Sequence, residues 1–127
     1  MIDQAPAELG RAAELWGNEL QPRYREYLDA LHAMPDTRRD SYALAAALLE
    51  TALELQAVGR ADAAAVAPLL LGDLCLSKAS RLLVRGGDIS IQVAFARVVE
   101  DAAAAAAAQT AAVDVRSRLR DVLARCA

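Results

Sequence analysis

Apolar residues recur every three or four positions along most of this chain of 127 residues. That spacing places them on one face of an α-helix, whereas no sustained stretch alternates polar and apolar residues as a half-buried strand does. Hydrophobic residues make up 56% of the chain, and many of them are alanine, the residue that helices accommodate best. The sequence therefore predicts an all-α fold, an antiparallel helical bundle in which residues 1–127 form a single domain.

Helix-breaking residues divide this pattern into four regions. The first spans about residues 6–33, and Pro22 should kink or interrupt it near residues 17–21, because proline removes a helical hydrogen bond. A turn at Pro35 ends it. The second region runs to residue 58 and the third to residue 85. Their expected boundary residues are Asp40 or Ser41 and then Gly59 for the second, and Asp62 and then Gly86-Gly87 for the third.

The last region begins at a cap formed by Asp88 or Ser90 and continues to about residue 125. Ile91, Phe95 and Val98 lie on one face of it and should form a buried stripe. No glycine or proline interrupts the region after its start. Residues 88–126 could therefore form one helix or two, and the sequence leaves both possibilities open.

The segment from Val66 to Leu76 is apolar on nearly all sides of the expected helix. Its apolar side chains include Leu69, Leu70, Leu71, Leu74 and Cys75. A helix that is apolar all round has to be buried on both sides. A chain this short has few layers with which to cover it. The segment therefore predicts a contact with another subunit.

One charge interrupts this apolar segment, and two interpretations of it remain open. Asp73 follows Gly72, and Ser77 lies one turn further along the same face. Either Asp73 sits at a solvent-facing edge, or Gly72 allows a second helix to approach closely and Asp73 is hydrogen-bonded across that contact. The second interpretation satisfies the rule that a buried carboxylate needs a partner.

Overall charge and the terminal segments exclude several classes of protein. The net charge is −3, and Asp114 and Asp121 interrupt the arginines near the C-terminus, so no nucleic-acid-binding surface is expected. Residues 1–10 contain no positively charged, apolar leader, and no apolar stretch is long enough to span a bilayer. We therefore expect a cytoplasmic protein without a transmembrane segment.

Side chains that could carry chemistry are few. His32 is the only histidine and is interpreted as a surface or capping residue. Glu50 and Glu54 lie one turn apart, but a metal site needs more ligands than these two, so both are expected to be solvent-exposed. Cys75 and Cys126 are isolated and are expected to be buried thiols. We predict no catalytic residue and no metal ligand in this chain.

One part of the sequence resembles a known family. The segment LLLGDLCLSKA, residues 69–79, is similar to the Gly-Asp-containing helix of the all-trans isoprenyl diphosphate synthases. At the family's spacing it is followed by Leu82-Leu83, by Gly86-Gly87-Asp88-Ile89 and by a helix with Phe95, Val98 and Val99. Residues 42–58 resemble the helix that leads into the family's first aspartate-rich motif. The resemblance covers about half of the chain and implies a truncated isoprenyl synthase fold.

The chain departs from the family where catalysis would occur. Catalytic members hold Mg²⁺ and substrate diphosphates with two aspartate-rich motifs. Residues 55–62 occupy the position of the first motif here and contain one acidic residue, Asp62, while the second motif would fall beyond this chain. The resemblance therefore implies the small, non-catalytic subunit of a heterodimeric hexaprenyl or heptaprenyl diphosphate synthase. It implies no activity alone, no cofactor bound by this chain, and Mg²⁺ in the catalytic large subunit.

Under this hypothesis the partners are the large subunit and the prenyl chain of its product. The small subunit would help to set product length in the synthesis of quinone side chains such as that of menaquinone. The candidates for the subunit interface or the product tunnel are Leu48, Leu55, Leu70, Gly72, Asp73, Leu74 and Leu76. Two alternatives remain: a homodimeric helical adaptor or regulator with no role in prenyl transfer, and a relative that binds a lipid or other apolar ligand in its helical core.

Overall fold

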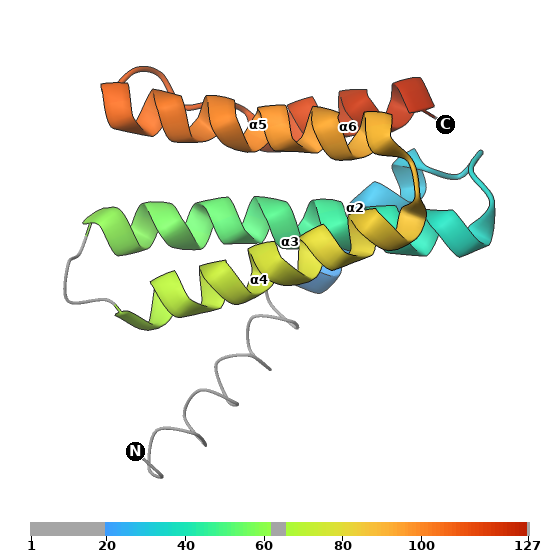
Figure 1. Ribbon diagram of the computed structural model, residues 1–127, viewed down its shortest axis with the longest axis horizontal. Helices are drawn as coiled ribbons and strands as arrows, with labels where there is room; N and C mark the ends of the chain where they lie inside the picture. Colours follow the sequence, from blue (N-terminus) through green and yellow to red (C-terminus); the bar gives the residue numbers. More distant parts are fainter. Residues whose placement is uncertain (1–19, 62–65, 127) are drawn as a thin grey trace, which may run out of the picture.

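The computed structural model describes residues 20–61 and 66–126 of the chain (Figure 1). Over these residues it contains five helices and no strand, which confirms the predicted all-α bundle. The helices are α2 (Gln21–Ala30), α3 (Asp36–Ala61), α4 (Val66–Gly86), α5 (Ile89–Ala108) and α6 (Val115–Cys126). The likeness to a truncated isoprenyl synthase fold stays a prediction.

Helix α3 forms the centre of the bundle. It runs antiparallel to α4 and beside α2, and α5 and α6 form a second layer over this group (Figure 1). Five alanines around the circumference of α3 have no exposed surface: Ala43, Ala45, Ala46, Ala47 and Ala52. Because alanine side chains are short, neighbouring helices can pack closely on several sides of α3.

Larger side chains from the other helices fill the space around α3. Helix α5 contributes the stripe predicted from its spacing, with Ile91, Phe95 and Val98 each 1% exposed. The remaining large core residues that are almost completely buried are Tyr27, Leu31, Tyr42, Leu49, Leu119, Val122 and Leu123. The core therefore draws on α2, α3, α5 and α6, and α4 adds Cys75, Ala79, Leu82 and Leu83.

The turn between α4 and α5 is built around a tyrosine from α3. A Cβ atom on Gly86 would lie 2.4 Å from Cζ of Tyr42, so the backbone of α4 rests directly on this ring. Gly87 follows with φ of +76°, a conformation that favours glycine. Asp88, one of the two predicted caps, then caps α5, because its Oδ1 accepts the amide hydrogens of Ser90 at 2.9 Å and Ile91 at 3.3 Å.

Both predicted ends of the second helical region were wrong. Helix α3 begins at Asp36, because the carbonyl of Pro35 accepts the amides of Arg38 and Arg39 at 3.1 and 3.0 Å. The helix also continues through Gly59 to Ala61. A glycine inside a helix costs only about 1 kcal/mol, which the extensive packing of α3 against α4 outweighs.

The remaining boundary predictions have different outcomes. The third region ends at Gly86, one residue later than expected. The Asp62 cap lies outside the described residues, as do residues 6–19 of the first region and with them most of the expected break near residues 17–21. Pro22 stands in the first turn of α2, where it is tolerated.

The open question about residues 88–126 is answered by a break after Ala108. Gln109 adopts a left-handed conformation with φ of +54°, and the amide of Thr110 donates to the carbonyl of Ala105 at 3.0 Å. Helix α6 begins at Val115, and the carboxylate of Asp114 accepts the amide of Ser117 at 3.1 Å. The reversal allows α6 to bury Leu119 and Leu123 in the core.

The Tyr42 contact predicts different costs for alanine at the two adjacent glycines. Gly86→Ala should lower the free energy of unfolding by about 3 kcal/mol, because the new methyl group would overlap the ring of Tyr42, which is completely buried. Gly87→Ala should cost about 1 kcal/mol, since nothing lies within 4 Å and only the left-handed backbone opposes it. Urea titrations of both variants provide the measurement. An equal loss in the two would contradict the packing of Gly86 on Tyr42.

Candidate functional site

Gly72 brings α4 against α3 within this chain. A Cβ on Gly72 would lie 3.2 Å from the carbonyl oxygen of Ala52 and 3.5 Å from Cβ of Leu55. Gly72 therefore permits a close helix approach, as one of the two interpretations required. Asp73 is exposed, which agrees with the other interpretation of a solvent-facing edge. Gly72 therefore belongs to the side of α4 that packs on α3, and Asp73 belongs to its solvent-exposed surface.

The predicted interface residues fall into two groups. Leu48 is buried in the core, and Leu55 and Leu76 are half-buried and packed against it. Gly72 and Leu55 lie on the α3–α4 contact. Leu70, Asp73 and Leu74 lie on the outward side of α4 instead.

The outward side of α4 exposes large apolar side chains. Leu70 is 57% exposed and Leu74 is 63% exposed, and they stand one turn apart. Helix α3 covers the other side of α4, where Cys75 is buried as predicted and burial raises the pKa of its thiol. Contacts among the described residues therefore account for the apolar side chains on one side of α4, but not for Leu70 and Leu74 on the other side.

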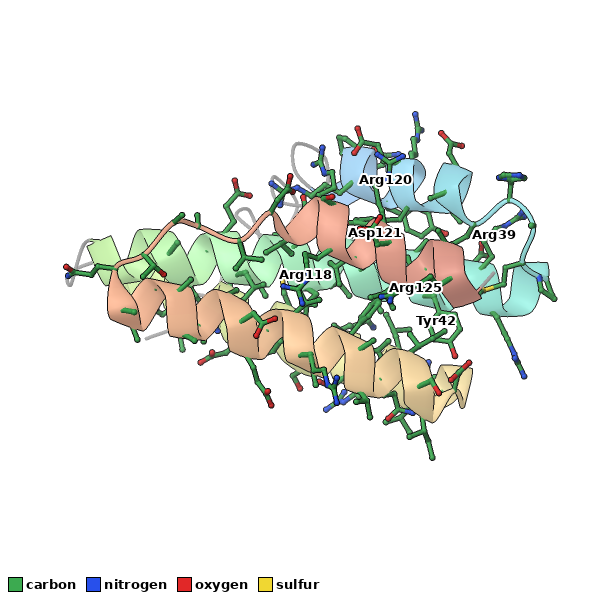
Figure 2. The ribbon with its side chains drawn as sticks, turned by 90° about the horizontal axis from the view of Figure 1, so that it is seen from above. Arg39, Tyr42, Arg118, Arg120, Asp121 and Arg125 are labelled. Carbon is green, nitrogen blue, oxygen red and sulfur yellow. The ribbon has the colours of Figure 1, made fainter. Side chains whose placement is uncertain are left out.

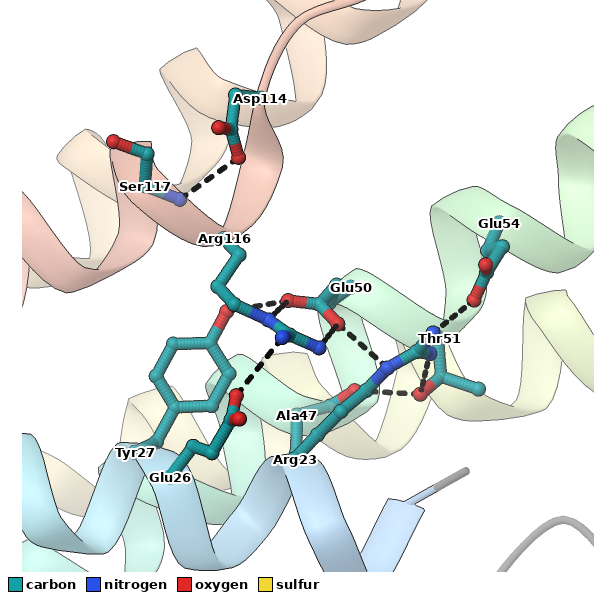
Figure 3. A network of polar contacts seen from close by, with 10 residues as sticks. All are labelled: Arg23, Glu26, Tyr27, Ala47, Glu50, Thr51, Glu54, Asp114, Arg116 and Ser117. Carbon is teal, nitrogen blue, oxygen red and sulfur yellow. Dashed lines mark hydrogen bonds and ion pairs between the residues drawn. The ribbon is translucent and has the colours of Figure 1, made fainter. Parts of the chain in front are cut away.

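A buried ion network lies on a different side of α3, centred on Glu50 (Figure 3). The Glu50 side chain is 10% exposed. From α2, Nε of Arg23 lies 2.6 Å from one carboxylate oxygen, and the Tyr27 hydroxyl donates to the other at 2.8 Å. From α6, Arg116 donates to both oxygens at 3.0 Å. One carboxylate thus joins three helices.

Flanking groups extend this network. Arg23 donates to the hydroxyl of Thr51 at 2.8 Å and pairs with the Glu54 carboxylate. Arg116 pairs with Glu26 at 3.0 Å. Burial, reinforced by Glu50, raises the pKa of the Tyr27 hydroxyl, and hydrogen bonding to Glu50 raises the pKa of Arg116. Both groups therefore keep their protons at neutral pH.

The expectation that Glu50 is solvent-exposed was wrong, whereas Glu54 is exposed as expected. Glu50 follows Ala46 by one turn on the buried surface of α3, and that placement within an apolar stripe was the signal available in the sequence. His32 is exposed as predicted, with Nδ1 lying 3.1 Å from the carbonyl oxygen of Asp29. The side chain of Cys126 lies outside the described part of the structure.

A cleft of about 770 Å³ opens beside the network. Arg23, Glu50 and Arg116 line its polar end. The rest is mostly apolar and comes from α3, the C-terminal turns of α5 and residues 110–115, with Leu53, Ala102 and Val113 among the lining side chains. The described residues include no group of three or more His, Cys, Asp and Glu side chains arranged to hold a metal ion. The cleft offers apolar contact and charge.

Comparison of the chain with protein-family models, with curated proteins and with solved structures finds no match. Within the described residues, 20–61 and 66–126, none of the helices combines the length and the apolar character needed to cross a membrane. Functional inference therefore rests on the outward face of α4, on the ion network, and on the resemblance of residues 66–101 to the all-trans isoprenyl diphosphate synthases.

The network predicts a large difference between two Glu→Gln substitutions. Glu50→Gln should lower the free energy of unfolding by about 3 kcal/mol, because Arg23 is nine-tenths buried and loses the buried one of its two carboxylate partners. The matched control is Glu26→Gln, whose carboxylate is about half exposed and should cost less than about 1 kcal/mol. Chemical denaturation at neutral pH measures both. Similar losses for the two variants would show that Glu50 does not hold the three helices together.

Proposed function

We propose that this chain is a non-catalytic subunit that binds the catalytic large subunit of a long-chain trans-polyprenyl diphosphate synthase. The observation that carries the proposal is the outward exposure of Leu70 and Leu74 within the segment that resembles the family's Gly-Asp helix. Large apolar side chains gathered on one exposed face are typical of a protein–protein contact. The proposal includes a cytoplasmic location.

Burial of these leucines would favour association. Covering a leucine side chain completely contributes about 2 kcal/mol, so two half-exposed leucines supply an anchor at the centre of an interface. Leu74 and Leu70 would contact the partner directly, and Asp73 lies beside them on the rim. Leu48, Leu55, Gly72 and Leu76 would act indirectly, by holding α4 against α3.

The role in catalysis would be structural. A growing prenyl chain needs an apolar tunnel, because each methylene removed from water contributes about 0.8 kcal/mol. The large subunit would supply Mg²⁺ and both diphosphate sites. This chain would close or brace the distant end of the tunnel and so help to set product length in quinone side-chain synthesis.

The same exposed face also fits a second copy of this chain, which supports the alternative of a homodimeric adaptor or regulator. In that case no synthase would be required for Leu70 and Leu74 to be buried. The two functions differ in the mass of the complex and in whether the complex condenses prenyl diphosphates.

The test is Leu74→Arg in the full chain, mixed with the synthase that co-purifies from the natural host. An arginine at a position that is 63% exposed should leave the fold intact, while complex formation and long-chain product should fall at least about tenfold. Ala124→Arg, on the exposed side of α6, is the matched control and should retain both complex formation and long-chain product.

Gel filtration and a prenyltransferase assay measure the outcomes. Full activity and binding with Leu74→Arg would contradict the proposal, and a purified homodimer that stimulates no condensation would favour the adaptor.

A further inference from the structure

A second hollow, of about 520 Å³, lies between the first half of α5 and α6. All of its charged lining residues are arginines: Arg97 from α5 and Arg118 and Arg125 from α6. Figure 2 shows Arg118 and Arg125 projecting from α6 to the side on which α5 lies. Three positive charges gather here in a chain whose net charge is −3.

Nearby acceptors occupy only part of the donor capacity of these arginines. Nη2 of Arg118 donates to the carboxylate of Asp101 at 2.8 Å, and Nε of Arg125 donates to the backbone carbonyl of Asp121 at 3.3 Å. Each guanidinium has five N–H donors, so the hydrogen bonds made among the described residues leave most of them available to a ligand. The N-terminus of α5 is already capped by Asp88, so attraction for an anion comes from the arginines.

The hollow also has an apolar part. Val122 lines it as a buried residue, and Ile89 and Val93 line it while being 72% and 47% exposed. Large apolar side chains in this position would gain from contact with a hydrocarbon group. Positive and apolar surfaces therefore meet within one hollow whose volume suits a small ligand.

We propose that this arginine hollow, lined by Ile89, Val93, Arg97, Arg118, Val122 and Arg125, binds a phosphate ester of a hydrocarbon chain. The phosphate would accept from the guanidinium groups, whose planar geometry matches phosphate oxygens in pairs. The first carbons of the chain would lie over Ile89 and Val93. The site is separate from Leu70 and Leu74, so it stands or falls independently of the proposed subunit role.

The ligand could reach the hollow from two sources, a phospholipid in a bilayer or a dissolved alkyl phosphate. Titration of the full chain with decyl phosphate below its critical micelle concentration tests the dissolved source. Flotation with vesicles of phosphatidylglycerol and phosphatidylcholine, against phosphatidylcholine alone, tests the bilayer source. Decyl maltoside, which has the same chain and no charge, is the ligand control.

The variant is Arg97→Gln combined with Arg125→Gln, and the matched control is Arg120→Gln. Arg120 lies on the side of α6 that faces α2 and does not line the hollow (Figure 2). The double variant should bind decyl phosphate or anionic vesicles at least about tenfold more weakly, while Arg120→Gln binds as the unmodified chain does. Circular dichroism verifies that the fold is unchanged.

Binding of decyl phosphate alone supports the site with a dissolved ligand, and capture by anionic vesicles alone supports it with a bilayer ligand. The proposal is overturned if neither probe binds, if decyl maltoside binds as tightly as decyl phosphate, or if the double variant and Arg120→Gln behave alike.

Discussion

The fold depends on a central helix that is covered on several sides at once. Helix α3 can be covered in this way because half of its buried positions from Tyr42 to Ala52 are alanine, so the surrounding helices can approach it closely. Gly72 plays the same role on α4, because the absence of a side chain lets that helix approach the backbone of Ala52 closely. Packing against α3 thereby fixes which side of α4 faces outward.

Glu50 is a buried carboxylate on this helix, and it connects α2 and α6, the first and last helices of the described chain. A carboxylate that is nine-tenths buried requires donors, and it takes them from Arg23 and Tyr27 of α2 and from Arg116 of α6. Such a pair contributes little net stability, but its loss leaves buried charge uncompensated. We infer that the network selects the register in which α2 and α6 pack on α3.

Much of the fold could be predicted from local patterns. The three-and-four spacing predicted helices, and the side chain of Asp88 could be identified as a cap because it precedes an apolar stripe. The break at Gln109 could not, because a residue other than glycine adopts the left-handed conformation there and its cost is repaid by burying Leu119 and Leu123. Less of the ion network could be predicted. The position of Glu50 within an apolar stripe indicated its burial. The convergence of Arg23 and Arg116 could not be predicted, because these residues are distant in sequence and meet only after α6 folds back.

The central claim is that another, catalytic chain covers the outward face of α4. The most direct measurement places a photo-crosslinking phenylalanine analogue at position 74 in the natural host and identifies the captured chain by mass spectrometry, with position 124 on α6 as the control. Our account predicts capture of one larger chain that carries two aspartate-rich motifs, from position 74 and not from position 124. Capture of only a second copy of this chain, or equal yields from both positions, would contradict it.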